Sequence, residues 1–242
     1  ASHLYRFATN GAARDVTAAA GLKTLVGSAG VLVDLDFTGK LDLLDLLPEN
    51  KGLRVLRNLG NMYFKDITAT SGVPAAVTGA RQIAVDDWNN DDLLDAFVAR
   101  EGQAPLYLQK QRGGPLVATN LPPVELAGTT VVLGDVNSDG RTDLLLGAPD
   151  HIDILLGGVN QVVRLPIKVP GLRFLRLVDY DNDGWLDLVA AGDGLQFWRN
   201  LGDAKFGDLT AKLGFDKLGA VPIEALAAAD FDQDGDTDLV LS

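Results

Sequence analysis

Five short stretches of the sequence repeat one pattern of acidic side chains. In the fourth, DYDNDGWLD at residues 179–187, four carboxylates fall within nine residues, and like charges this close repel one another unless a cation binds them. Positions one, three and five carry Asp, Asn or, once, Thr, and position nine is always Asp. The pattern therefore predicts cation sites. The other copies are DLDFTGKLD (34–42), DWNNDDLLD (87–95), DVNSDGRTD (135–143) and DFDQDGDTD (230–238).

Calcium suits this set of oxygen ligands better than magnesium does. It accepts about six to eight oxygens in flexible geometry, whereas magnesium keeps its waters and requires a strict octahedron. Side chains at positions one, three, five and nine and the carbonyl at position seven can surround one ion, and Gly at position six permits the sharp turn. We predict up to five calcium ions. The predicted ligands, with the position-seven residue giving only its carbonyl, are Asp34, Asp36, Thr38, Lys40 and Asp42; Asp87, Asn89, Asp91, Leu93 and Asp95; Asp135, Asn137, Asp139, Arg141 and Asp143; Asp179, Asp181, Asp183, Trp185 and Asp187; and Asp230, Asp232, Asp234, Asp236 and Asp238.

The five loops differ in the number of carboxylates that they offer. Loops 4 and 5 carry four each, and loops 1 to 3 carry three. We expect loops 1 and 2 to bind most weakly, because Thr38 replaces an acid in loop 1 and Asp92 replaces the turn glycine in loop 2. Five calcium ions would offset most of the net charge of -12, so the acidic excess belongs mainly to these loops.

The acidic loops fit an EF-hand, a dockerin module or ordinary polar turns less well. The EF-hand shares the first nine positions but requires a Glu at position twelve and flanking helices. Polar surface turns also use Asp and Gly, but five copies at separations of 44 to 53 residues argue against ordinary turns. A dockerin module has a similar loop, usually as a pair flanked by helices. The EF-hand requirement is not met here, because none of the five loops has Glu at position twelve, where the residues are Asp45, Val98, Leu146, Ala190 and Leu241.

The elements around each loop are predicted to be strands. Short apolar runs precede and follow every copy, as VVLGD and DLLLG do around loop 3, and such runs bounded by turn residues predict buried strands. A second repeat lies between the loops, because VLRNLGNMYFKDIT (55–68) aligns without a gap to FWRNLGDAKFGDLT (197–210). The N-terminal LYRFATNGAARDVT (4–17) aligns to both. Each unit is thus two hairpins.

Two hairpins in about 48 residues predict an all-β fold, a β-propeller of four-stranded antiparallel blades. We expect one domain over residues 1–242 with five blades. The N-terminal strands would complete the C-terminal blade and close the ring, which covers an exposed sheet edge. A five-blade segment of a larger propeller would show the same repeats. The expected blades are 18–68, 75–118, 124–166, 170–210, and 222–242 with 1–17.

The second repeat also contains three pairs of opposite charges, one in each of these copies. Arg and Asp recur at equivalent places, and we expect each pair to meet within its own outer hairpin, with a small contribution to stability. The pairs are Arg6 with Asp15, Arg57 with Asp66, and Arg199 with Asp208.

These residues resemble the FG-GAP/VCBS repeat family, whose calcium-loop blades also occur in the integrin α-subunit head. The resemblance covers essentially the whole chain, and the FWRNLGDAKFGDLTAKLGF stretch (197–215) is similar to bacterial secreted members. The Phe-Gly and Gly-Ala-Pro signature is mostly missing, apart from residues 147–149. The resemblance implies a propeller with calcium in the hairpins of strands one and two, on one face, and an extracellular or periplasmic location. Family propellers usually have seven or more blades, so five is a departure.

Composition narrows the possible functions. The chain has no Cys, which excludes disulfides and thiolate metal sites, and only two His, His3 and His151, which disfavours zinc sites and Ser/His hydrolases. The acidic balance disfavours nucleic acid as a partner. No apolar run approaches about 18 residues, so no membrane span is expected.

The leading hypothesis is a non-catalytic binding module for a protein or a glycan. By analogy with integrin-like propellers, the ligand would bind opposite the calcium loops, but the sequence assigns no ligand-binding residue. A lectin would use aromatic side chains, yet Trp88, Trp185 and Trp198 are better explained by packing. A polysaccharide-acting enzyme would need a base such as His151 or Tyr180, and a structural spacer stays open. The connections on that face are about 18–29, 46–54, 71–80, 100–105, 118–130, 148–151, 166–172 and 211–222.

Overall fold

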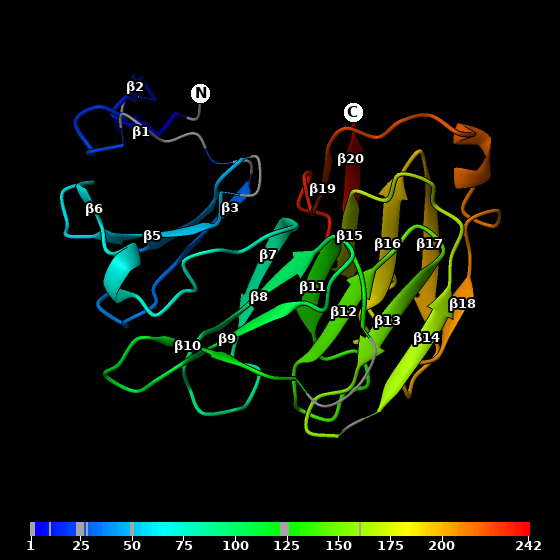
Figure 1. The fold of residues 1–242 in the computed structure, drawn as a ribbon. Helices are drawn as coiled ribbons and strands as arrows, with labels where there is room; N and C mark the ends of the chain where they lie inside the picture. The colour runs from blue at the N-terminus through cyan, green and yellow to red at the C-terminus, as the bar shows by residue number, and fades with distance from the viewer. Residues whose placement is uncertain are drawn as a thin grey trace.

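The computed structural model is an all-β protein of successive antiparallel sheets (Figure 1). It describes residues 3–9, 11–22, 27, 29–48, 51–121, 126–159 and 161–242. Within these residues, four sheets have four strands each, in chain order from one edge to the other, and two further sheets are single hairpins. The four-stranded antiparallel units predicted from the repeats are therefore confirmed.

The strands and the two short 3-10 helices have the following bounds. The first sheet holds β3 (Ala29–Val33), β4 (Asp42–Leu46), β5 (Leu53–Asn58) and β6 (Phe64–Asp66), and the second holds β7 (Ala80–Asp86), β8 (Asp95–Arg100), β9 (Leu106–Lys110) and β10 (Leu116–Thr119). The third holds β11 (Thr130–Gly134), β12 (Asp143–Gly147), β13 (His151–Leu155) and β14 (Val162–Pro166), and the fourth holds β15 (Phe174–Val178), β16 (Asp187–Gly192), β17 (Gly194–Asn200) and β18 (Phe206–Asp208). The hairpins are β1 (Tyr5–Phe7) with β2 (Ala13–Asp15) and β19 (Leu226–Ala229) with β20 (Asp238–Leu241), and the helices are η1 (Thr68–Thr70) and η2 (Phe215–Leu218).

The second strand of each sheet lies at the centre of the packing. Strands β12 and β16 are buried at every residue, and β8 is buried at every residue except its last. A strand covered on both faces needs apolar side chains on both, which explains why these segments read as continuous apolar runs and not as alternating ones. The acidic loop of each of these sheets joins such a strand to the first strand, so the loop ends on a buried strand.

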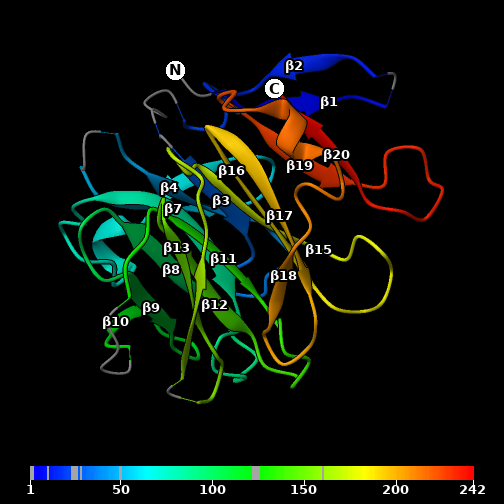
Figure 2. The ribbon, with the colours of Figure 1, turned by 90° about the vertical axis from the view of Figure 1, so that its right-hand side faces the viewer.

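Neighbouring sheets stack through apolar clusters that follow the chain order. One cluster joins the first and second sheets through Leu44 and Val98, and another joins the second and third through Phe97 and Leu144. Leu145 and Leu175 belong to the cluster between the third and fourth sheets. The first strands β3, β7, β11 and β15 contact one another in sequence (Figures 1 and 2). The arrangement is propeller-like, with the first strands innermost.

The two terminal hairpins are separate in the described part of the chain. Strands β1 and β2 lie beside the first sheet, where Phe64 N donates to Ala20 O, while β19 lies next to β15 (Figure 1). No strand pairing joins the two hairpins among the described residues, so the closed ring stays a prediction. Several predicted positions lie outside the described residues: 1, 2 and 10 of the N-terminal hairpin, and 23–26, 28, 49–50 and 122–125 of the predicted ligand-face connections.

Close backbone approach at the end of β16 requires a glycine. A Cβ on Gly192 would lie 2.6 Å from Gly171 O and 2.8 Å from Leu172 Cα, both of which are backbone atoms. We expect Gly192→Ala to lower the free energy of unfolding by about 1–3 kcal/mol, because the two segments must move apart. Gly207→Ala is the matched control in β18, where the nearest atom would lie at an ordinary 3.4 Å. Urea unfolding of both variants measures the difference, and equal effects would contradict this account of the packing.

Candidate metal centres

The five acidic loops share one backbone conformation. In each, the position-one aspartate accepts backbone hydrogen bonds from positions five and six, at 3.1 and 3.0 Å from Asp183 and Gly184 to Asp179 in loop 4. Position four is left-handed in every loop. Asp92 replaces the position-six glycine at φ 65°, as expected for the residue that must take that turn. The first ligand of each loop is thus fixed by the backbone. The other position-one bonds run from Thr38 and Gly39 to Asp34, from Asp91 and Asp92 to Asp87, from Asp139 and Gly140 to Asp135, and from Asp234 and Gly235 to Asp230.

The position-nine aspartate links each loop to the third strand of its sheet. Its carboxylate accepts a backbone N–H from that strand, at 2.7 Å from Asn200 to Asp187 in loop 4, or from the second residue after the strand, at 2.8 Å from Gly157 to Asp143 in loop 3. Loop 5 lacks a third strand among the described residues, so Asp238 accepts only from Phe231 N and is less buried. In loops 1 and 2 the donors are Asn58 and Lys110 to Asp42 and Asp95.

Burial changes the acidity of these position-nine carboxyls. Desolvation raises the pKa of Asp42, Asp143 and Asp187, and it raises the pKa of Asp95 to about 6. The backbone N–H donors act in the opposite direction because they favour the carboxylate. An ionised carboxylate removed from water is stabilised by a nearby cation, so the buried ninth position is where a bound ion would relieve the most unfavourable charge.

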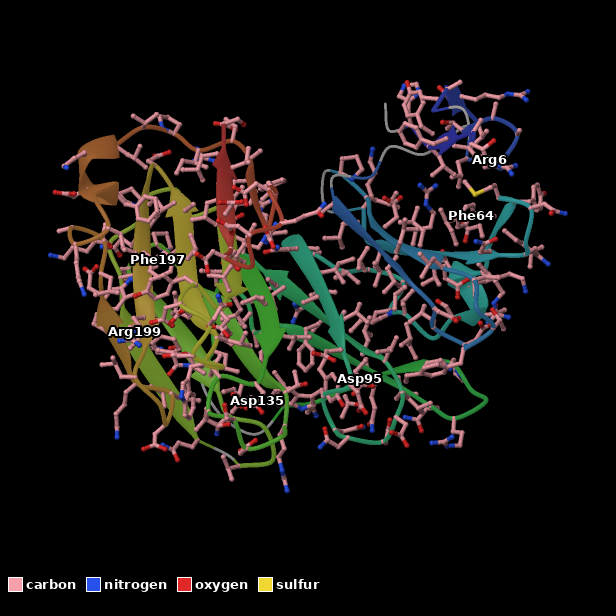
Figure 3. The ribbon with its side chains drawn as sticks, turned by 180° about the vertical axis from the view of Figure 1, so that it is seen from behind. Arg6, Phe64, Asp95, Asp135, Phe197 and Arg199 are labelled. Atoms are coloured by element: carbon pink, nitrogen blue, oxygen red, sulfur yellow. The ribbon has the colours of Figure 1, made fainter. Side chains whose placement is uncertain are left out.

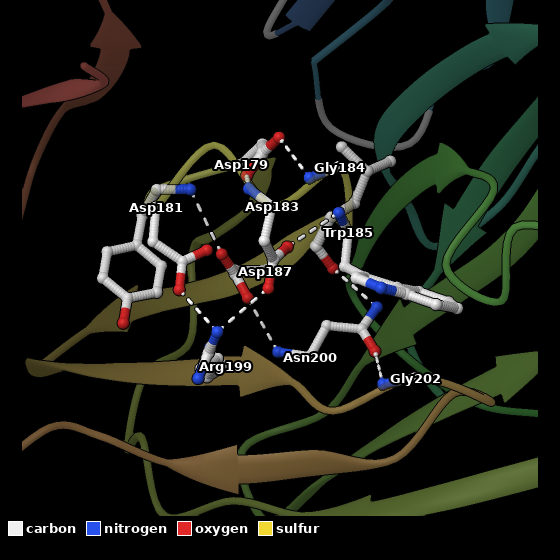
Figure 4. A network of polar contacts seen from close by, with 11 residues as sticks. Asp179, Asp181, Asp183, Gly184, Trp185, Asp187, Arg199, Asn200 and Gly202 are labelled. Atoms are coloured by element: carbon white, nitrogen blue, oxygen red, sulfur yellow. Dashed lines mark hydrogen bonds and ion pairs between the residues drawn. The ribbon is translucent and has the colours of Figure 1, made fainter.

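Loops 4 and 5 bring three carboxylates together. One ligand oxygen from each of Asp179, Asp181 and Asp187 lies within 4.8 Å of the others, and Asp230, Asp232 and Asp238 do the same. Figure 4 shows the loop 4 group, where the side chains converge above β17. These two clusters could hold metal ions. The described residues contain no other group of three acidic or histidine side chains this close. Loops 2 and 3 have Asn at position three, whereas loop 1 has Asp at positions one, three and nine but does not bring these side chains as close together.

The remaining predicted ligands lie at the edges of these clusters. Asp183 and Asp234 at position five are outside the groups of three, and their Oδ1 atoms accept N–H from Trp185 and Asp236 at 2.9 and 3.0 Å. Asn89 and Asn137 at position three donate to Asp91 and Asp139 within their own loops. The role of the position-seven carbonyls as metal ligands stays a prediction.

An arginine that the ligand pattern did not include lies in loop 4. Arg199 Nη2 is 2.7 Å from Asp181 Oδ2 and 3.0 Å from Asp183 Oδ2. Figure 4 shows its side chain reaching the loop from β17, and Figure 3 marks Arg199 in the whole molecule. In loop 1, Arg57 Nη2 lies 3.5 Å from Asp36 Oδ2. The Trp185 N–H and then Arg199 lower the pKa of Asp183. A cation of the protein itself therefore shares two of the predicted calcium ligands.

The prediction that these arginines pair within their outer hairpins was wrong. In the β17–β18 register, Arg199 lies opposite Gly207, whereas Asp208 lies opposite Trp198. Side chains on adjacent strand residues point to opposite faces, so Arg199 and Asp208 cannot meet. Asp208 instead accepts a hydrogen bond from Thr210 N at 2.8 Å. The first sheet repeats the arrangement with Arg57 opposite Lys65 and Asp66 bonded to Thr68 N, and in the N-terminal hairpin Arg6 lies opposite Arg14 while Asp15 accepts from Thr17 N.

Some neighbouring loops touch directly. Asn182 at position four of loop 4 donates to Gly235 O at 3.1 Å and to Asp236 Oδ1 at 2.9 Å in loop 5. Asn90 at the same position of loop 2 donates to Gly140 O of loop 3 at 3.3 Å. Loop 2 is therefore joined to loop 3, and loop 4 to loop 5, by side-chain hydrogen bonds.

The other residues considered for chemistry have packing or local roles. Trp88 stacks edge-on against Phe97 at 5.3 Å between ring centres, and Trp198 packs against the cluster between the third and fourth sheets. Trp185 lies over Gly202, whose added Cβ would meet the indole at 3.5 Å. His151 Nδ1 lies 2.7 Å from Asp150 Oδ1, an exposed neighbour in sequence. None of the three tryptophan positions recurs as an aromatic side chain at the equivalent place of every described four-stranded sheet.

Comparison with known proteins decides the family. The FG-GAP-like repeat model matches residues 87–146 and 179–241, which together make up just over half of the chain. The chain belongs to the FG-GAP-like repeat family. The matched segments contain loops 2 to 5 and most or all of the second strand that follows each of them, so the resemblance inferred from the aspartate pattern is confirmed.

This FG-GAP-like chain is also similar to two curated relatives and to two solved structures. Cartilage acidic protein 1 from Homo sapiens is 25% identical over 199 residues, which cover 74% of this chain and 30% of the relative, and the Mus musculus protein gives the same identity with 31% of its length covered. The chain thus spans about a third of these relatives. The same fold occurs in a lectin from Agrocybe aegerita described as recognising non-reducing terminal N-acetylglucosamine, with a TM-score of 0.60 and 17% identity over 87% of this chain and 60% of the lectin. A second structure, the Photorhabdus luminescens Tc holotoxin pore, matches with a TM-score of 0.51 and 18% identity over 99% of this chain and 13% of its own.

The arginine in loop 4 gives a prediction with two readouts. We expect Arg199→Gln to raise the calcium affinity of loop 4 by about fivefold, because a fixed positive charge beside two ligands repels the ion. Without calcium, the same variant should melt at a lower temperature, since Asp181 and Asp183 lose their counterion. Lys212→Gln removes the same charge from an exposed position away from the loops and is the control. An unchanged or weaker calcium affinity in Arg199→Gln would show that the guanidinium does not compete with the ion.

Loop 2 holds its position-nine carboxylate differently from loops 3 to 5. Tyr107 Oη donates to Asp95 Oδ2 at 2.8 Å, where the other loops use the backbone N–H of position two. We expect Tyr107→Phe to lower the free energy of unfolding by about 1–3 kcal/mol, because it leaves a buried carboxylate oxygen without a donor. Tyr63→Phe, on a side chain that is 51% exposed, should change it by less than about 0.5 kcal/mol. Chemical denaturation measures both, and a neutral Tyr107→Phe would contradict this role.

Proposed function

We propose that this chain is a calcium-stabilised, non-catalytic binding module that recognises a protein or glycan on the face opposite its acidic loops. The observation that carries the proposal is the meeting of three carboxylate oxygens within 4.8 Å in loop 4 and again in loop 5. Carboxylates held this close by backbone donors repel one another, and a divalent ion removes the repulsion. The face with the loops would then be structural, and recognition would fall to the other face.

A closed five-bladed ring is the architecture that we propose for this module. The C-terminal hairpin β19–β20 has only the first two strands of a blade, and the N-terminal hairpin β1–β2 aligns in sequence with the last two. Their union would complete a fifth blade and cover Val240, which is 52% exposed on β20. It would also give the β20 aspartate, Asp238, the third-strand donor that the other position-nine aspartates have.

The location that suits such a module is extracellular or periplasmic. Calcium sites of extracellular modules bind at about 0.1–1 mM, a concentration range that is met outside the cytosol. At about 1 mM calcium each site would add roughly 0.4–1.4 kcal/mol to the free energy of unfolding. Several sites together would then contribute a large share of the stability of a domain, about 5–15 kcal/mol.

A glycan is the second candidate for the ligand, and the lectin from Agrocybe aegerita with the same fold supports it. A polysaccharide-acting enzyme is the alternative from another class, for which His151 would be the base. We favour the binding module because His151 Nδ1 is paired with Asp150, and the charged side chain beside His151 in the nearby cavity, Arg164, is paired with Asp153. None of the helices in the described residues could cross a membrane. A glycan array tests the lectin function directly, and turnover of polysaccharide that is lost in His151→Ala would replace the binding proposal by an enzyme.

The calcium proposal is tested by thermal melting and calorimetric titration of the metal-stripped chain. We expect about 10 mM calcium to raise the melting temperature by several degrees, and we expect at least two ions to bind. Asp181→Asn and Asp232→Asn each remove one carboxylate from a cluster and keep the side-chain shape, so each should abolish one site. Asp216→Asn changes an exposed acid outside the loops and is the control, which should alter neither the number of bound ions nor the calcium-dependent rise in melting temperature. A chain that binds no calcium and melts unchanged would overturn the proposal.

A further inference from the structure

A cavity of about 410 Å³ opens on the face opposite the acidic loops. The loops join the end of each first strand to the start of the second, so the starts of the first strands lie at the other face. Residues at or just before the starts of β3, β7, β11 and β15 line this cavity. It therefore lies where the innermost strands of four sheets meet. Its lining includes Arg81, Gln82, Thr130, Arg173, Phe174 and Arg176.

The polar lining is cationic in a chain of net charge -12. Arg81 bonds to Glu101, and Arg173 Nη1 lies 2.9 Å from Asp193 Oδ1, but neither acid lines the cavity. Arg176 is half-buried and donates only to the backbone oxygen of Leu175, at 2.8 Å. It has no carboxylate partner among the described residues. A half-buried guanidinium without a counterion is the feature of this cavity that the fold itself does not explain.

The rest of the lining adds donors and an apolar wall. Gln82 Oε1 accepts a hydrogen bond from Val131 N at 2.9 Å, which fixes the amide and leaves its NH2 group without a partner in the described part of the chain. Leu172 and Phe174 supply apolar surface beside these groups. The volume falls in the range of small-molecule sites, roughly 300–1,000 Å³, and exceeds what a lone carboxylate needs.

We propose that this cavity binds an acidic monosaccharide unit, a pyranose that carries a carboxylate. Arg176 would pair with the carboxylate, for which a planar guanidinium is suited, with Arg81 and Arg173 adding to the positive potential. The Gln82 amide would donate to a ring hydroxyl, and Phe174 would contact the apolar face of the ring. An acidic peptide would use the arginines but has less need of this apolar wall. The inference rests on the proposed recognition face and names its ligand class.

The test uses the calcium-loaded full chain and calorimetric titration with D-glucuronate. We expect glucuronate to bind and D-glucose, which lacks the carboxylate, to bind at least about tenfold more weakly. Arg176→Gln should lower the glucuronate affinity by at least about tenfold. Arg14→Gln, on an exposed arginine of β2, should leave it unchanged. Saturation-transfer difference NMR on the same samples should show contact with the ring protons of glucuronate, as expected if Phe174 lies against them.

Each contrary result has a defined meaning. Absence of glucuronate binding, or equal binding in Arg176→Gln with an unchanged melting temperature, would overturn the proposal. Sulfate binding as tightly as glucuronate would overturn the sugar assignment and indicate an adventitious ion only. A triglutamate peptide binding as tightly as glucuronate would overturn it in favour of an acidic peptide. A calcium-dependent melt without glucuronate binding would reject the cavity and keep the calcium module. Glucuronate binding without any effect of calcium on the melting temperature would keep the cavity proposal and reject the calcium module.

Discussion

The four-stranded sheets depend on a buried aspartate at the start of each second strand. Asp95, Asp143 and Asp187 are fully buried, yet each stands at the ninth position of an acidic loop. Their carboxylates accept N–H groups from the loop or the third strand, so one side chain connects the loop, the second strand and the third strand. A buried charge is tolerated only when it is hydrogen-bonded and compensated. Position nine thus anchors each of these exposed loops in the core, and a cation bound there would act on the whole sheet.

The stacking of the sheets explains why this connection matters. The second strands are covered on both faces, so any movement of a loop that carries their first residue must disturb the clusters on either side. Asn182 and Asn90 extend the connection sideways from one loop to the next. The same geometry separates the roles of the two faces. In the proposed function the acidic face serves stability, and the opposite face, where Arg176 has no carboxylate partner among the described residues, serves recognition.

Much of this could be predicted from the sequence, because the repeated aspartate pattern and the apolar runs are local signals. The hairpins, the four-stranded units and the family all follow from them. The pairing of Arg199 could not be predicted in this way, because a shift of one residue along a strand reverses the face, and only the register of β17 with β18 fixes it. The arginine cavity had no sequence signal either, since Arg81 and Arg176 are far apart in the chain and meet only through the stacking of sheets. Two carboxylate clusters instead of five also reflect side-chain placement and not only residue type.

Amide hydrogen exchange with and without calcium tests the central claim most directly. The amides to follow are those of Gly157 and Asn200, which lie outside the acidic loops and donate to Asp143 and Asp187. If the position-nine aspartate couples the ion to the sheet, calcium slows exchange at these amides as well as within the loops. Protection confined to the loops, with exchange at Gly157 and Asn200 unchanged, would contradict the account.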